Sequence, residues 1–139
     1  MTRITEIQFK SLPIVQHADR LTAKALDIYA NAVLVVPAKG DGLKSLPHGD
    51  VLAARLKRSD HKLDAAEPLK TVLPNRTGTE ITLAGVAEDI SSFDLLTRAR
   101  RLIAPHAGKD MKLAIAVVGR SPALTTRGLE ALVAAAAAR

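Results

Sequence analysis

The segment from Lys39 to Lys44, Lys-Gly-Asp-Gly-Leu-Lys, has residue types and spacing that could bind a phosphate. It follows an apolar run and precedes an amphipathic stretch, so its backbone N–H groups could surround an anion at the start of a helix. Gly40 and Gly42 have no side chain, so they would let the anion approach the backbone closely. The segment lacks the third glycine of a dinucleotide fingerprint and the Gly-Lys-Ser/Thr of a P-loop, and Gly-Asp-Gly is also a common turn. Gly40 and Gly42 are therefore a candidate phosphate loop, with an ordinary turn as the favoured alternative.

The histidines are too dispersed to predict a metal site. None has a partner at the His-Glu-x-x-His spacing that places ligands on one helix face. They are His17, His48, His61 and His106. We interpret His48 and His61 as exposed, titrating side chains, and His106 as a residue at a helix C-terminus, where the helix dipole favours it. No metal ligand is predicted in this chain.

Catalytic nucleophiles and acid–base pairs are also not apparent. The chain contains no cysteine, and none of its serines lies in a Gly-x-Ser-x-Gly turn. Asp60 with Asp64, and Glu88 with Asp89, are close in sequence, but general acid–base catalysis needs two carboxyl groups held in one cleft with divergent pKa values. Solvated acids at helix ends fit these positions better, so no catalytic residue is predicted.

The charge distribution argues against nucleic acid as the partner. The net charge is +6 and the sequence pI is about 10.0, which allows weak attraction to polyanions. The basic residues are mostly interleaved with acids, however, and two Phe and one Tyr are too few to stack bases. We interpret the group Arg98, Arg100 and Arg101 as a solvated helix face rather than an anion clamp.

Apolar patterning predicts strands that alternate with helices. The predicted strands are Ile4–Phe9 at a sheet edge, Ala32–Pro37 at the centre, Leu69–Leu73, Glu80–Val86 and Lys112–Gly119. The predicted helices are Asp19–Tyr29, Pro47–Arg58 with the proline at its first position, a helix from about Ser91 to Ile103, and a last helix capped by Ser121-Pro122 or Thr126.

Two of these elements have more detailed expectations. Ser91 with Asp94 three residues later forms a capping-box pattern, and the helix that follows should bury Phe93, Leu96, Ala99 and Ile103 on one face. The strands near Leu69 and Glu80 are too close in sequence for a crossover helix, so they should pair antiparallel.

Together these elements predict an α/β fold, a three-layer sandwich with a mixed central sheet, formed by residues 1–139 as a single domain. The longest apolar runs, 32–38 and 113–119, are far too short to cross a membrane, and the N-terminus lacks the apolar region of a signal peptide. The absence of cysteine fits a reducing compartment. We expect a cytoplasmic protein with no membrane partner.

The order of elements resembles the amino-terminal domain of the leucyl aminopeptidase (cytosol aminopeptidase) family. The stretches that carry the resemblance are Asn31–Pro37, Leu69–Pro74, Glu80–Ala87, the strand from Lys112 to Gly119, and the Ala-rich segment 124–136. Residues 84–87, Ala-Gly-Val-Ala, depart from the Gly-Leu-Gly that is usual in the family. The resemblance covers about residues 30 to 139.

The resemblance implies a macro-domain-like fold and a non-catalytic accessory role. In this family the amino-terminal domain supports oligomer assembly or substrate access, while a carboxy-terminal domain holds two divalent metals, Mn or Zn, and removes amino-terminal residues from peptides. The Asn-Thr-Asp-Ala-Glu-Gly-Arg motif of that domain is absent from this chain. The resemblance therefore implies no cofactor here, a carboxy-terminal catalytic domain as partner, and a homo-oligomer in the full-length protein. The alternatives are a macro-like module that binds a nucleotide or ADP-ribose, and a DNA-binding accessory domain.

Overall fold

The computed structural model describes residues 2–8, 14–16, 22–38, 42–63, 67–106, 112–118 and 122–137. Its strands are β1 (Thr2–Gln8), β2 (Ile14–Gln16), β3 (Asn31–Pro37), β4 (Leu69–Val72), β5 (Glu80–Val86) and β6 (Lys112–Val118). Its helices are α1 (Ala23–Leu26), α2 (Gly49–Arg58), α3 (Ser92–Ile103) and α4 (Pro122–Ala137), with 3-10 turns η1 (Gly42–Ser45) and η2 (Ala104–His106).

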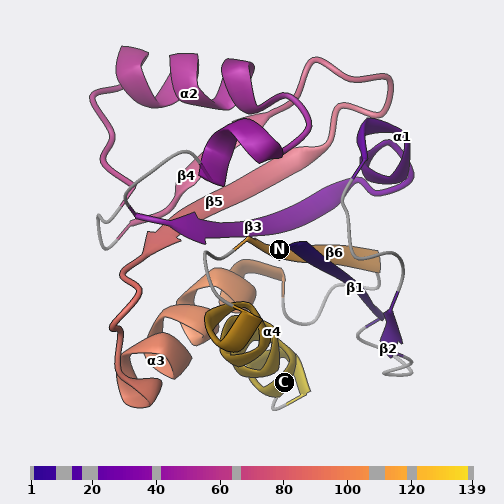
Figure 1. Cartoon of the computed structure of the whole chain (residues 1–139). Helices are drawn as coiled ribbons and strands as arrows, with labels where there is room; N and C mark the ends of the chain where they lie inside the picture. The colour runs from indigo at the N-terminus through magenta and orange to yellow at the C-terminus, as the bar shows by residue number, and fades with distance from the viewer. Residues whose placement is uncertain are drawn as a thin grey trace.

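The strands form one mixed sheet in the order β2-β1-β6-β3-β5-β4 (Figure 1). β3 pairs in parallel with both β5 and β6, whereas β1 runs antiparallel to β6. β4 pairs antiparallel with β5, as the short connection between them predicts. The predicted α/β class and mixed central sheet are confirmed.

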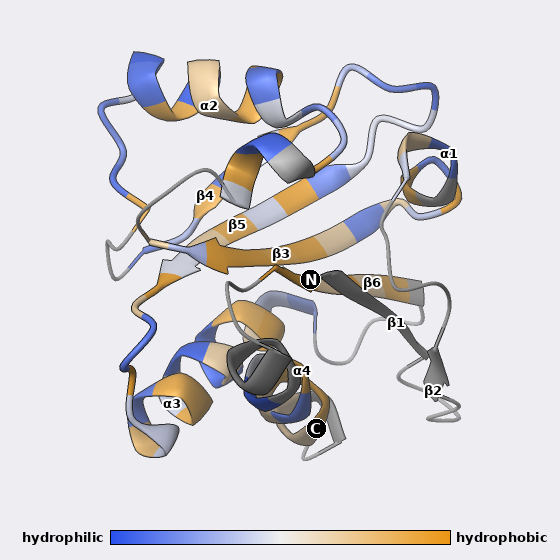
Figure 2. Cartoon of the chain, in the orientation of Figure 1, coloured by the Kyte–Doolittle hydropathy of each residue, from blue (hydrophilic) through white to orange (hydrophobic). Residues whose placement is uncertain are grey.

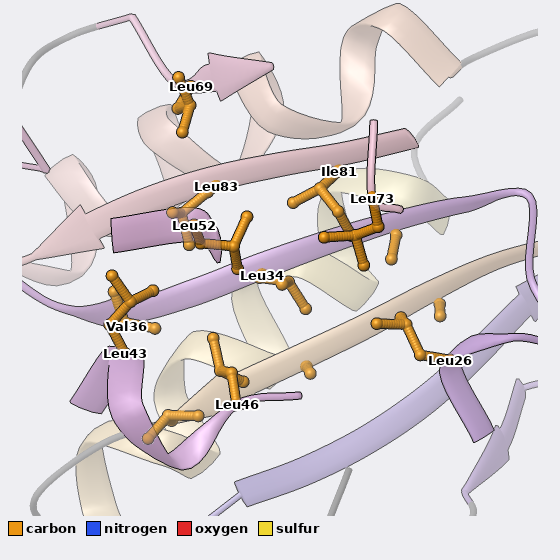
Figure 3. Close-up of a cluster of buried hydrophobic side chains, with 14 of the residues drawn as sticks. Leu26, Leu34, Val36, Leu43, Leu46, Leu52, Leu69, Leu73, Ile81 and Leu83 are labelled. Carbon is orange, nitrogen blue, oxygen red and sulfur yellow. The ribbon is translucent and has the colours of Figure 1, made fainter. Parts of the chain in front are cut away.

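The middle strand β3 is buried along its whole length because helices cover both faces of the sheet. Leu34 lies in a cluster with Leu83 of β5 and Leu52 of α2 (Figure 3). The neighbouring residues Val33 and Val35 belong to a second cluster, with side chains of α3 and α4. In Figure 1, α2 lies above the sheet and α3 and α4 lie below it. Side chains of one strand therefore enter two cores alternately, which explains its continuous apolar run (Figure 2).

Two predicted elements near the N-terminus differ from the structure. β1 is not an edge strand, since β2 pairs with its outer side. Of the helix predicted over Asp19–Tyr29, the described part is helical only in α1, and residues 19–21 lie outside the described residues. α1 ends at Leu26 because the next carbonyl groups bond to another loop: Thr77 Oγ1 donates to Asp27 O, and Thr79 Oγ1 donates to Tyr29 O at 2.8 Å. Ile28, an apolar residue of the predicted helix, is 71% exposed.

α2 begins two residues later than predicted, so Pro47 is not its first residue. His48 precedes the helix with φ 58° and ψ 24°, a left-handed conformation that a helix cannot include. Gly49 then packs directly on η1, because a Cβ built there would lie 2.2 Å from Leu43 O. This close approach fixes where α2 starts.

The N-terminus of α3 is as predicted, and its buried face agrees with the prediction in part: Ala99 and Ile103 are buried, whereas Leu96 is half-buried. The Ser91 side chain accepts a hydrogen bond from Asp94 N at 3.1 Å, which confirms the cap. The buried residues are Leu95, Ala99, Leu102 and Ile103. Phe93 is 77% exposed, because it lies in the first turn while the core contact begins at Leu95.

α4 begins at Pro122, so the alternative in which Thr126 caps this helix is wrong. Thr126 lies in the second turn, whereas Pro122 occupies the first helical position, where the missing N–H of proline costs no hydrogen bond. Ser121, the other proposed cap, lies outside the described residues.

The cap of α3 should be measurable as a change in stability. Replacing Ser91 with Ala removes the acceptor for Asp94 N, and we expect the free energy of unfolding to fall by about 1 kcal/mol. Urea denaturation followed by circular dichroism measures this difference. Ser92→Ala is the matched control, since Ser92 is an exposed helical residue, and it should change stability by less than about 0.5 kcal/mol. Equal effects of the two substitutions would contradict the assigned cap.

Gly85 is required by packing on the α2 side of the sheet. A Cβ there would lie 2.8 Å from Leu63 Cβ and 2.9 Å from Leu63 O, and Gly85 N donates to the same oxygen at 2.8 Å. We expect Gly85→Ala to lower the free energy of unfolding by about 1–3 kcal/mol, measured by denaturation. Ala87→Val adds bulk at an exposed position and is the control. A Gly85→Ala variant as stable as the parent would show that the contact between Gly85 and Leu63 has room for a methyl group.

Candidate functional site

Only part of the candidate phosphate loop lies in the described residues. Gly40 lies outside them, as do Lys39 and Asp41, whereas Gly42 begins η1. A Cβ at Gly42 would lie 2.7 Å from the Pro37 ring, so packing against the end of β3 is sufficient to require glycine there. Phosphate binding at Gly40 and Gly42 stays a prediction.

The histidines do not come together. His17 lies outside the described residues; His48 precedes α2 and is half-buried, and His61 is also half-buried with Nε2 2.8 Å from Glu67 O. The interpretation of His48 and His61 as fully exposed is therefore wrong, because turns at the two ends of α2 partly cover them. His106 ends the turn η2 after α3 and is buried. Within the described ranges, no three His, Asp or Glu side chains are grouped so that they could hold a metal ion.

The paired carboxylates and the arginine group lie on the surface. Asp60 is exposed at the end of α2 with φ 52°, and Asp64 lies outside the described residues. Glu88 and Asp89 form an exposed turn before α3. On α3, Arg98 is half-buried, whereas two arginines are exposed, Arg100 and Arg101. A solvated helix face describes the two exposed arginines.

The structure instead contains a cleft that the patterns in the sequence did not predict. Its volume is about 370 Å³, and its lining residues are Asn31, Lys70, Thr71, Val72, Glu80, Ile81, Thr82, Pro105 and His106. Asn31 and Glu80 are the first residues of β3 and β5, so the cleft lies where these parallel strands start. It is at the opposite end of the strands from Pro37 and the candidate phosphate loop.

Strand register places the polar residues of this cleft on one face of the sheet. Asn31 pairs with Glu80 across β3 and β5, and Lys70 pairs with Thr82 across β4 and β5. Alternation along each strand puts these four residues on the face that also carries Val33 and the α3 core. η2, which follows α3, closes this side with Pro105 and His106.

Two of these polar side chains are buried, and two are exposed. Asn31 is 9% exposed and Thr82 is 5% exposed, while Lys70 and Glu80 are exposed residues. Among the residues that the structure describes, none of the four side chains makes a hydrogen bond or an ion pair. The cleft thus offers an amide, a hydroxyl, one cation and one anion, which is a set suited to binding rather than to covalent chemistry.

The edge strand of the cleft, β4, is held in place from the other side of the sheet. An Arg55 guanidinium nitrogen on α2 donates to Thr71 Oγ1 at 2.5 Å and to Val72 O of β4. Arg55 therefore fixes the edge strand that carries Lys70. Nothing in the sequence distinguishes Arg55 from the other basic residues of this amphipathic helix.

The start of β5 is fixed by a polar turn. Asn75 Oδ1 accepts from Thr79 N at 2.9 Å, and Asn75 Nδ2 donates to Thr79 Oγ1 at 2.8 Å. The same Thr79 hydroxyl donates to Tyr29 O, and Glu80 N donates to Ala30 O at 2.8 Å. The turn between β4 and β5 is thereby tied to the segment before β3, which sets the positions of both Asn31 and Glu80.

Comparisons of the chain with protein-family models, with curated proteins and with solved structures find no match. Among the described helices, none combines the length and the apolar character that crossing a membrane requires. The proposed function therefore rests on the resemblance noted in the sequence and on how the fold arranges the stretches that carry it.

Thr79 and Thr82 are both buried, but only one of them is bonded within the described protein. Thr79→Val removes the hydroxyl that links Asn75 and Tyr29, so we expect the free energy of unfolding to fall by about 1–3 kcal/mol. Thr82→Val is the matched control and should stay within about 0.5 kcal/mol of the parent, since its hydroxyl has no described partner. Denaturation of both variants tests this; a larger loss for Thr82→Val would contradict the assignment.

Proposed function

We propose that this chain is the non-catalytic, amino-terminal accessory domain of a metal-dependent leucyl aminopeptidase. Its role is to support assembly of the enzyme or access of peptides to a separate catalytic domain. As part of the same proposal, we place it in the cytosol, because its cysteine-free composition fits a reducing compartment.

The observation that supports this proposal is the arrangement of the stretches that carry the resemblance. Four of them are neighbouring strands in one sheet, in the order β6-β3-β5-β4. The Ala-rich segment lies in α4, and its residues Leu132 and Ala135 pack with strand residues of the second core. Stretches that resemble one domain family therefore form one folded core rather than separate units.

The metal chemistry of the proposal belongs to the other domain. The described residues supply no group of three metal ligands, so they do not fit the two divalent ions, Mn or Zn, that the resemblance implies. The residues of this chain are assigned structural and binding roles only, and the removal of amino-terminal residues is assigned to the partner domain.

Two parts of the proposal can be tested, the presence of a catalytic domain in the same protein and the contribution of this domain to the enzyme. The reading frame that contains this chain should also encode the Asn-Thr-Asp-Ala-Glu-Gly-Arg motif, and the protein it encodes should release p-nitroaniline from leucine p-nitroanilide in the presence of Mn²⁺ or Zn²⁺. Deleting residues 1–139 from that protein should change its oligomeric state in analytical ultracentrifugation, or raise KM for peptides while the catalytic domain stays folded.

The isolated chain of residues 1–139 should release no p-nitroaniline under the same conditions. Turnover by the isolated chain, at a rate that scales with its concentration and survives repurification, would refute the accessory role. A reading frame without the catalytic motif would refute the family assignment.

A further inference from the structure

Two largely buried residues of the cleft present polar groups that the described chain leaves free. Asn31 and Thr82 are more than nine-tenths buried, and neither side chain makes a hydrogen bond to a described residue. Their polar atoms are not among the fully buried, unpartnered side-chain atoms of the described residues, so water or a ligand in the cleft can reach them. Both residues line the cleft, so a molecule in the cleft is placed to complete their bonds.

The charges beside them indicate the chemistry of that molecule. Lys70 is directly opposite Thr82 in the antiparallel pair, and Glu80 is directly opposite Val72, so Lys70 and Glu80 are diagonal neighbours on one face. Diagonal residues of a pair are about 7–8 Å apart. Both side chains are exposed and form no ion pair with each other, so both charged groups are available to one small ligand. A site with one cation and one anion favours a ligand that carries both charges.

An apolar wall completes the cleft. Val72 lies on β4, two residues after Lys70 and directly opposite Glu80 of β5. It is 49% exposed, one of few large hydrophobic side chains left in solvent among the described residues. Pro105 of η2 is exposed on the other side. A ligand with a short aliphatic group would cover both residues and gain free energy from their burial.

We propose that this cleft binds a free α-amino acid with an aliphatic side chain, as the zwitterion. The Lys70 ammonium group binds the carboxylate, and the Glu80 carboxylate binds the α-ammonium group. The Asn31 amide and the Thr82 hydroxyl complete the hydrogen bonds of the ligand, and its side chain covers Val72 and Pro105. The cleft, of about 370 Å³, is at the small end of the range for ligand sites, as a molecule of this size requires.

Other small ligands fit the cleft less well. A phosphate or a simple carboxylate would meet the negative charge of Glu80, and a simple cation would meet Lys70. A metal ion would need three or more ligands, which the described residues do not bring together. The inference does not depend on the proposed accessory role, because it rests on the cleft alone.

The test is a titration of the ¹⁵N-labelled chain with L-valine, followed by NMR chemical shifts and by calorimetry. We expect saturable shifts in the Asn31 side-chain amide and in the backbone N–H groups of residues 70–72 and 80–82. N-acetyl-L-valine lacks the cation and L-valinamide lacks the anion, so each should bind about tenfold or more weakly. Glycine has both charges and no side chain, so it should also bind more weakly.

Variants assign the binding to the cleft. Lys70→Met and Glu80→Gln should each weaken L-valine binding about tenfold or more, since each removes one charge-assisted hydrogen bond. Thr82→Val should weaken it as well, and its unfolding curve shows whether the fold is intact. Lys62→Met and Glu67→Gln are the matched controls, because these exposed residues do not line the cleft, and they should leave the affinity unchanged.

Three results would overturn the inference. The first is the absence of saturable shifts up to about 10 mM L-valine with the folded parent chain. The second is N-acetyl-L-valine binding as tightly as L-valine, which would make the cleft an anion site governed by Lys70 alone. The third is shifts centred on Gly42 and the other end of the strands, which would place the ligand outside this cleft.

Discussion

The structure depends on burying β3 from both sides. This strand lies in the middle of the sheet between two parallel neighbours, and each of its faces belongs to a different core. The chain has almost no aromatic residues, so apart from Tyr29 both cores consist of Leu, Ile, Val and Ala, whose shapes fit only when the helices lie close to the sheet. Close packing also extends to the connecting segments, because a Cβ at Gly49 would meet the backbone of η1 and a Cβ at Gly85 would meet Leu63 in the loop after α2.

The central part of the fold could be predicted because its signals are local and strong. The run at β3, the bounds of β5 and the cap of α3 each depend on residues within a few positions of one another. The predictions that were wrong involve tertiary contacts. α1 is short because Thr77 and Thr79, about fifty residues away, bond to the carbonyl groups that follow it, those of Asp27 and Tyr29. The buried face of α3 was predicted correctly at Ala99 and Ile103 but not at Phe93, because the first turn lies beyond the core.

The cleft could not be predicted, because its residues come from three strands and a turn. Asn31 and Thr82 have a recognisable signal, since each is a polar residue within a strand that is otherwise apolar on both faces. That signal does not say whether the protein itself supplies their hydrogen bonds. Thr79 and Thr82 look equivalent in sequence, but only Thr79 is bonded, because the Asn75 side chain folds back onto it. Strand register was needed to bring Lys70 and Glu80 to the same face.

The bond from Arg55 to Val72 O has a consequence for how copies of the protein behave at high concentration. β4 is the last strand of the sheet, and an outermost strand with unpaired carbonyl groups can recruit a strand of another molecule and start aggregation. Here a guanidinium group from α2 already uses one of these carbonyl groups, and the strand is only four residues long. An arginine that holds the strand in position thus also protects the margin of the sheet against intermolecular pairing.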